Sequence, residues 1–243
     1  MNIIVCDNYQ ELSAMAGDIM AAVVKENENC VLGLATGSTP VGAYQELIKK
    51  YQAGELDFAH VTNFNLDEYY PMAVDNAQSY HVFMQENLFK SINVPADKIH
   101  VPDGSVEDAQ AQCDWYDEQI EKAGGIDLML LGIGENGHIG FNEPGDSLEC
   151  GTHIHKLTES TLQANARFFG EGEQMPTHAI TMGVASIIRN SRKILMLVNG
   201  VKKYPILKAL QEDVVTTQIP ASLLRLHPDV TVICDKAAFY GEA

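Results

Sequence analysis

The segment Val31-Leu-Gly-Leu-Ala-Thr-Gly-Ser-Thr-Pro40 passes from an apolar run into a polar turn that contains glycine. A helical pattern follows, in which Tyr44, Leu47 and Ile48 recur at helical spacing. The apolar run does not alternate with polar residues, which is typical of a strand covered on both faces of its sheet. The segment therefore predicts a buried strand, a tight turn and a helix.

Apolar runs and helical patterns alternate along the rest of the chain. Strands are expected at 3–5, 31–35, 61–66, 99–101, 126–131, 194–198 and 230–234. Helices are expected after Asn8 and near 77–90, 106–123, 158–168, 183–190, 202–211 and 219–226. This alternation predicts an α/β fold with a doubly wound, mainly parallel sheet and helices on both faces (Rossmann-like). We expect a single domain over residues 1–243, with ligands bound beyond the carboxyl ends of the strands.

A surplus of acidic side chains limits the partners of this chain. Asp and Glu number 33 against 16 Lys and Arg, so the formal net charge is −17. The long-range field then opposes nucleic acids and anionic membranes, which proteins bind by neutralising phosphates, and we expect neither partner. An anionic small molecule is compatible with this charge, because a few local cations and helix ends can hold it.

The cysteines and the apolar runs indicate a cytoplasmic protein. The five cysteines are odd in number and form no Cys-x-x-Cys pair, which favours reduced thiols. No apolar run approaches the roughly 20 residues of a membrane span. We expect no signal peptide, because no basic segment followed by an apolar one opens the chain.

The turn at 36–40 is a candidate phosphate site. Gly37 lets the backbone turn tightly, while Thr36, Ser38 and Thr39 offer N–H groups and hydroxyls at the start of a helix. The turn matches neither a Walker loop nor Gly-x-Gly-x-x-Gly, so a nucleotide cofactor is unsupported. A simple capping turn explains this segment equally well.

Asp67 follows the third expected strand, within Asn65-Leu-Asp-Glu-Tyr-Tyr70. A carboxylate at the edge where ligands bind is placed to act as a general base. The alternative is that Asp67 and Glu68 are ordinary loop acids.

The segment Gly132-Ile-Gly-Glu-Asn-Gly-His-Ile-Gly-Phe-Asn-Glu-Pro144 holds four glycines around one histidine. His138 can transfer protons near neutral pH if a neighbour fixes its tautomer, and Asn136 or Glu143 can do this. Glycines at the end of an apolar strand indicate that backbone lies very close to another group. We interpret this segment as functional.

Other polar positions are less specific. Arg167 and Lys203 are candidate phosphate cations, with Lys202 as a competing choice. His153 and His155 are spaced to share one face of a strand, which could suggest a metal site. No Cys or acidic ligand set has recognisable spacing around them, so an exposed pair is the better explanation and no metal is expected. The irregular stretch 144–176 is either an active-site lid or a surface excursion.

These segments together resemble the glucosamine-6-phosphate deaminase (isomerising) family. The resemblance rests on motifs that follow the family order over nearly the full length: Leu34-Ala-Thr-Gly-Ser-Thr-Pro40, Asn65-Leu-Asp-Glu-Tyr69, Gly132 to Pro144, Asn165-Ala-Arg-Phe-Phe169, Gly200-Val-Lys-Lys203 and Leu226-His-Pro-Asp229.

The resemblance implies a conversion of glucosamine 6-phosphate and water into fructose 6-phosphate and ammonia, without a cofactor, in amino-sugar catabolism. His138 would move the proton that opens the sugar ring, and Asp67 would carry the C2 proton to C1. Asn136 and Glu143 would hold and polarise His138. The substrate would be held by Thr36, Gly37, Ser38, Thr39, Gly137, Arg167 and Lys203.

Two features depart from the family pattern. Many members carry Asp in place of Asn136, so His138 is expected to be oriented here with less stabilisation of its imidazolium form. Hexameric members activated by N-acetylglucosamine 6-phosphate have a basic effector site in the region aligned with 146–156 and a longer tail. In that region this chain has Asp146, His153, His155 and Lys156, and it ends soon after Tyr240 without the longer tail. We therefore expect no such activation and a monomer or small homo-oligomer.

Two alternatives remain. A 6-phosphogluconolactonase has a similar phosphate turn and would use His138 to activate water. A non-catalytic sugar-phosphate-sensing module would bind the ligand without turnover.

Overall fold

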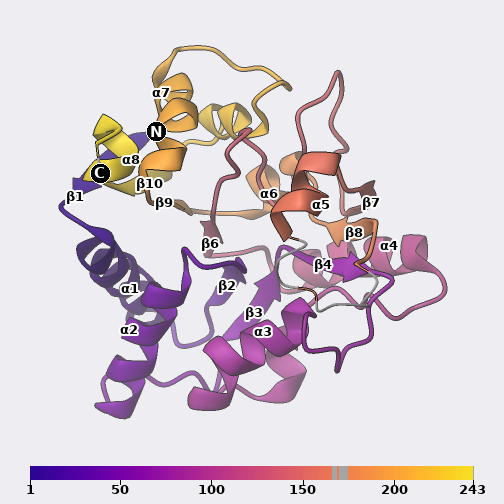
Figure 1. Ribbon diagram of the computed structural model, residues 1–243. Coiled ribbons are helices and arrows are strands. Elements are labelled where there is room, and N and C mark those ends of the chain that lie inside the picture. The colour runs from indigo at the N-terminus through magenta and orange to yellow at the C-terminus, as the bar shows by residue number, and fades with distance from the viewer. Residues whose placement is uncertain (166–168, 170–174, 243) are drawn as a thin grey trace.

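Seven parallel strands form the central sheet of the structure, a computed structural model that describes residues 1–165, 169 and 175–242 (Figure 1). Their spatial order is β1-β10-β9-β6-β2-β3-β5. The strands are β1 (Asn2–Cys6), β2 (Val31–Leu34), β3 (Thr62–Asn65), β5 (Ile99–His100), β6 (Leu128–Leu131), β9 (Ile194–Val198) and β10 (Val230–Asp235). In β6, Leu128 and Leu130 face one core while Met129 and Leu131 face the other. The uninterrupted apolar runs are therefore strands buried on both faces.

Helices cover both faces of this sheet, as Figure 1 shows. One core packs against α1 (Tyr9–Glu26), α2 (Val41–Gln52) and α3 (Tyr80–Asn87). The opposite core packs against α4 (Ala109–Lys122), α6 (Val184–Asn190), α7 (Tyr204–Gln211) and α8 (Lys236–Tyr240). The predicted doubly wound α/β fold is confirmed.

A second, antiparallel sheet lies beside the first and was not expected from the sequence. It consists of β4 (Asp67–Tyr70), β8 (His178–Thr181) and β7 (His153–Lys156), in that order. Its strands have four residues each and are separated by long stretches of chain, so no local hydrophobic pattern announces their pairing. His153 and His155 lie on β7 and are half-buried, which corrects the expectation of an exposed pair.

Smaller differences concern the short elements. Residues 220–226 form a 3-10 helix, η5 (Pro220–Leu226), where a helix of ordinary type was expected, and a second 3-10 turn, η4 (Val201–Lys203), precedes α7. The stretch 144–176 contains β7 and α5 (Glu159–Asn165), and its residues 166–168 and 170–174 lie outside the described residues. Its role as a lid stays a prediction.

Within the described ranges, no helix has the length and apolar character needed to cross a membrane.

Candidate active site

The predicted site residues that the structure describes lie where the strand order reverses. From β2 the chain continues outward through β3 and β5, whereas β6 lies on the other side of β2 and leads to β9 and β10. The chain segments that directly follow β2, β3, β6 and β9 hold residues 36–40, 66–67, 132–144 and 199–203, and Asp67 already begins β4. Because the strands are parallel, these loops leave the sheet at the same edge, which is the usual ligand position in such folds.

The turn after β2 is held in place by two residues that sequence reasoning missed. The Tyr9 hydroxyl lies 3.0 Å from the carbonyl oxygens of both Ser38 and Thr39 and accepts the Gly42 N–H at 2.9 Å. The Thr39 hydroxyl donates to Asn199 Oδ1 at 2.7 Å, which joins this turn to the loop after β9. The Thr39 hydroxyl hydrogen is thus used within the protein, and the role of Thr39 on the substrate stays a prediction.

The same turn offers an open helix end to an anion. Pro40, the N-cap residue of α2, makes no side-chain capping hydrogen bond, and the first turn holds no acidic residue, although Tyr9 takes the Gly42 N–H. Gly37 and Ser38 are exposed there, and Thr36 is half-buried. The free N–H groups and the positive end of the helix dipole therefore face solvent, where they can bind a phosphate.

Lys203 supplies a cation beside this turn. Its Nζ donates to the Ile133 carbonyl at 2.6 Å, and its side chain is half-buried at the end of η4. Burial lowers the pKa of Lys203, while the charge of Glu135 opposes that shift. Lys202, the competing choice, is exposed. Arg167 lies outside the described residues, so its predicted role is not tested.

The loop after β6 folds tightly around His138. The Gly134 N–H donates to the His138 carbonyl at 2.9 Å, and the Gly137 N–H donates to the Gly134 carbonyl at 3.0 Å. A Cβ at position 134 would lie 2.3–2.5 Å from atoms of the imidazole ring, so only glycine fits beneath it. Gly137, predicted to bind substrate, uses its carbonyl to accept the Ala221 N–H at 2.9 Å.

His138 is paired with an ionised carboxylate. Its Nδ1 lies 3.4 Å from Glu143 Oε2, close enough for an ion pair when the ring is protonated. Glu143 Oε1 also accepts hydrogen bonds from the hydroxyls of Thr158 and Thr161. Burial alone would raise the pKa of Glu143, but His138, Thr161 and Asn136 together lower it to about 2.

Asn136 does not contact the imidazole ring. Its Nδ2 donates to Glu143 Oε2 at 2.6 Å, and its Oδ1 accepts the backbone N–H of His138 at 3.2 Å. The amide therefore orients Glu143 and the turn, whereas the sequence left open whether Asn136 or Glu143 fixes the imidazole.

Asp67 begins β4 and is only 6% exposed. It pairs in register with Thr181 of β8. A Cβ on Gly140 would lie 2.7 Å from Thr181 Oγ1 and 3.5 Å from Asp67 Oδ2, so this glycine lets the loop of His138 approach the carboxylate. Burial, and secondarily the charge of Glu68, raises the pKa of Asp67 to about 8.

A cavity of about 470 Å³ lies between the turn and α3. Gly37 and Ser38 line one side of it, and the aromatic rings of Tyr69, Tyr80 and Phe169 line another. In the described part of the chain, no group of three or more His, Cys, Asp or Glu side chains is arranged to hold a metal ion.

Comparisons with known proteins show which family this sequence matches. The family model described as glucosamine-6-phosphate isomerases/6-phosphogluconolactonase matches residues 7–233. A glucosamine-6-phosphate deaminase of Thermoanaerobacter pseudethanolicus is 51% identical, covering 98% of this chain and 94% of that protein. One of Clostridium perfringens is 49% identical, covering 98% of each.

Solved structures show the same fold. A structure described as a monomeric glucosamine-6-phosphate deaminase superposes with a TM-score of 0.96 and 42% identity, covering 100% of both chains. The 6-phosphogluconolactonase of Thermotoga maritima superposes with a TM-score of 0.75 at 22% identity, covering 96% of this chain and 98% of that one. The second likeness concerns the fold alone.

The environment of Asp67 predicts a pH-dependent cost to stability. The ordinary pKa of this carboxyl is 3.8, against about 8 in the folded protein. Between these values the unfolded chain ionises Asp67 while the folded protein keeps its proton, so stability falls as pH rises. We expect Asp67→Asn to unfold at a higher temperature than wild type, with a difference that widens from pH 5 to 8 and then levels off. Thermal unfolding across this range measures it, and a constant difference would contradict the assignment.

Proposed function

This chain belongs to the family of glucosamine-6-phosphate isomerases and 6-phosphogluconolactonases, and within it we propose that the chain is a glucosamine-6-phosphate deaminase. It converts glucosamine 6-phosphate and water into fructose 6-phosphate and ammonia, in the cytoplasm and in amino-sugar catabolism. Relatives of that name, about half identical over nearly the whole chain, support this activity.

The observation that carries the proposal is a pair of carboxylates with opposite environments. Asp67 is buried and has a pKa of about 8, whereas Glu143 has a pKa of about 2 and stays ionised beside His138. Environments that separate the pKa values of two carboxylates in this way give them different roles, here Asp67 as the base and Glu143 as the counter-charge of His138. The two groups reach the same edge of the sheet from different strands.

The first step opens the sugar ring. His138 moves the proton between the C1 hydroxyl and the ring oxygen, and the negative charge of Glu143 stabilises the imidazolium that forms. Asn136, Thr158 and Thr161 hold Glu143 in position through their hydrogen bonds.

The second step moves a proton from C2 to C1. The Asp67 carboxylate removes the C2 proton to form an enolamine and then returns it to C1. The unsaturation now lies between C2 and nitrogen, and water adds to this carbon to release ammonia and leave the ketone. Burial makes Asp67 a stronger base than an exposed carboxylate, and the substrate's own ammonium group favours its ionised form.

The phosphate anchors the substrate far from the reacting carbons. The open N-terminus of α2 with Gly37 and Ser38 offers N–H groups, and Lys203 adds a positive charge. We retain Thr36 and Arg167 as further phosphate ligands from the resemblance. Binding energy at this remote group holds C1 and C2 at the catalytic groups.

Asp67→Asn tests the reaction directly. The amide has nearly the same shape but cannot accept the C2 proton, so we expect turnover to fall by at least about 100-fold. Ammonia and fructose 6-phosphate are measured together, since the proposed reaction releases them in equal amounts. A folded wild-type protein that binds glucosamine 6-phosphate and releases neither product would refute the function, and lactone hydrolysis would be assayed next.

A matched pair of variants separates the charge of Glu143 from its orientation. Glu143→Gln removes the counter-charge of the imidazolium, and we expect kcat to fall about 100-fold. Thr161→Val keeps the volume and the charge but removes one hydrogen bond to Glu143, and we expect a loss below about 10-fold. Steady-state kinetics at pH 7.5 give both values, and equal losses would show that charge is not the important property.

We also propose that the protein is a monomer or a small oligomer, supported by the 42% identical relative described as monomeric. Multi-angle light scattering should give the mass of one chain of 243 residues, or a small multiple of it. A hexameric mass would contradict the proposal.

A further inference from the structure

Glu68 is a buried carboxylate that the proposed mechanism does not use. It follows Asp67 on β4, and because side chains alternate along a strand, the two carboxylates point to opposite faces. Glu68 is 2% exposed and has no lysine or arginine partner in the described ranges. A carboxylate this deep in a protein is costly unless its oxygens are satisfied.

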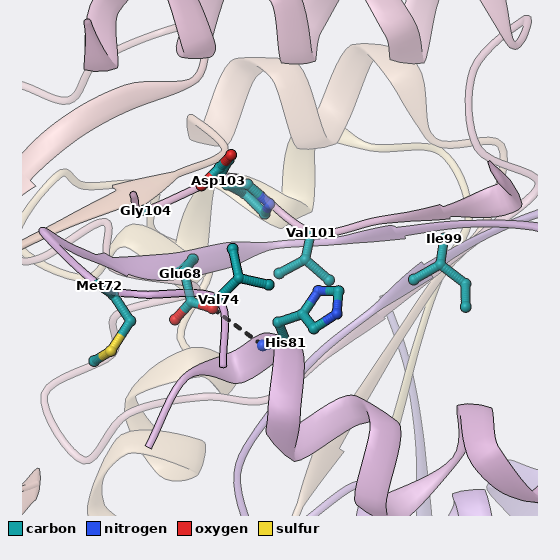
Figure 2. A pocket seen from close by; sticks show the side chains of 9 residues that line it. Glu68, Met72, Val74, His81, Ile99, Val101, Asp103 and Gly104 are labelled. Carbon is teal, nitrogen blue, oxygen red and sulfur yellow. Dashed lines mark hydrogen bonds between the residues drawn. The ribbon is translucent and has the colours of Figure 1, made fainter. Parts of the chain in front are cut away.

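Backbone N–H groups of α3 satisfy it instead. Glu68 Oε1 accepts the N–H groups of Tyr69 and Tyr80, each at 2.9 Å, and Oε2 accepts that of His81 at 3.0 Å. Figure 2 shows the carboxylate reaching the start of the helix beside His81. Ser79 caps the same turn locally by accepting the Val82 N–H at 3.0 Å. Glu68 therefore satisfies N–H groups that the local cap leaves free, and it joins α3 to the strand of Asp67.

The helix turn bound by Glu68 carries Tyr80, which packs with Tyr69 and Phe141; these three rings are called the aromatic wall below. The Tyr80 ring lies 4.8 Å from that of Tyr69, between ring centroids, and 6.2 Å from that of Phe141, in parallel planes. Phe141 belongs to the loop that carries His138 and Glu143. Tyr69 and Tyr80 also line the cavity of about 470 Å³ that opens at Gly37 and Ser38. A shift of α3 would thus change the surroundings of Asp67, of the His138 loop and of the phosphate turn together.

We propose that Glu68 is a positioning residue of the deaminase reaction: its carboxylate fastens the first turn of α3 to β4 and so fixes the aromatic wall next to Asp67. This inference rests on the proposed function, since it assigns Glu68 a part in that reaction. Its charge has a second effect: burial raises the pKa of Glu68 itself to about 7, and where Glu68 is ionised its negative charge raises the pKa of Asp67.

Few other charged groups surround the two carboxylates. Asp103 and His81 line a cavity of about 180 Å³ beside Glu68 (Figure 2). Burial raises the pKa of Glu68, and the negative charge of Asp103 raises it further. Asp67 is approached by the phenols of Tyr80 and Tyr116, and His153 lies in its row of the small sheet beyond Thr181. Burial raises the pKa of both phenols, so they are neutral at assay pH, and Glu68 is the carboxylate whose charge raises the pKa of Asp67.

Two substitutions at Glu68 separate the effect of side-chain length, which lets the carboxylate contact α3, from the effect of its charge. Glu68→Gln keeps the length but turns an NH2 group toward backbone donors and removes the charge. Glu68→Asp keeps the charge but is one methylene too short to reach α3. Glu107→Gln removes one negative charge from an exposed side chain of the neighbouring loop and serves as the matched control.

Kinetics and amide hydrogen exchange are measured on the full chain. We expect both Glu68 variants to lose about 10- to 100-fold in kcat/KM and to exchange faster at Tyr80 and His81. Only Glu68→Gln should move the acid limb of the pH profile of kcat/KM to lower pH, by about one unit, because a like charge next to Asp67 is removed. The control should show none of these changes.

The outcomes distinguish this inference from the function on which it rests. Wild-type turnover with unchanged kinetics and exchange in Glu68→Gln would overturn the positioning role and leave the deaminase intact. Lost activity without faster exchange of α3 or a shifted acid limb would also overturn it. A wild-type protein without turnover would refute the deaminase function itself, while exchange would still show whether Glu68 holds α3.

Discussion

The parallel pairing of β6 with both β2 and β9 is the constraint on which the site depends. β6 is apolar on both faces and lies between strands from two different parts of the chain. Its insertion beside β2 brings the turn at 36–40 and the loop at 132–144 to the same edge. The Thr39–Asn199 hydrogen bond then joins the loop after β9 to that turn. The loops after β2, β6 and β9 therefore form one rim at this edge of the sheet.

The rim creates environments of contrasting polarity. Asp67 sits where backbone and apolar side chains exclude water, so its charged form is disfavoured. Glu143 is also buried, yet three hydrogen-bonding side chains and His138 favour its charged form. Two carboxylates of one site thus differ in pKa by several units because one is surrounded by donors and the other is not. This difference costs stability at Asp67, which is common where a group is placed for chemistry rather than for folding.

The small antiparallel sheet gives the site its second support. β4 carries Asp67 toward one face and Glu68 toward the other, and β8 and β7 hold this strand from the side. α3 is attached to the same strand through Glu68 and carries Tyr80 toward Phe141. The base, the aromatic wall and the His138 loop are therefore positioned by a single four-residue strand.

The sequence by itself determined the parallel sheet, the glycine-rich segment around His138 and the position of Asp67 after a buried strand. These features follow from local hydrophobic patterns and from the order of strands and turns, which neighbouring residues express directly. It did not determine that Asn136 binds Glu143 and not the imidazole, that Tyr9 holds the phosphate turn, or that Glu68 caps a helix twelve residues away. The small sheet was not predicted for the same reason, because its strands are short and β4 pairs with β8 across more than a hundred residues. Contacts between distant segments depend on how the whole chain packs, and only the tertiary structure decided them.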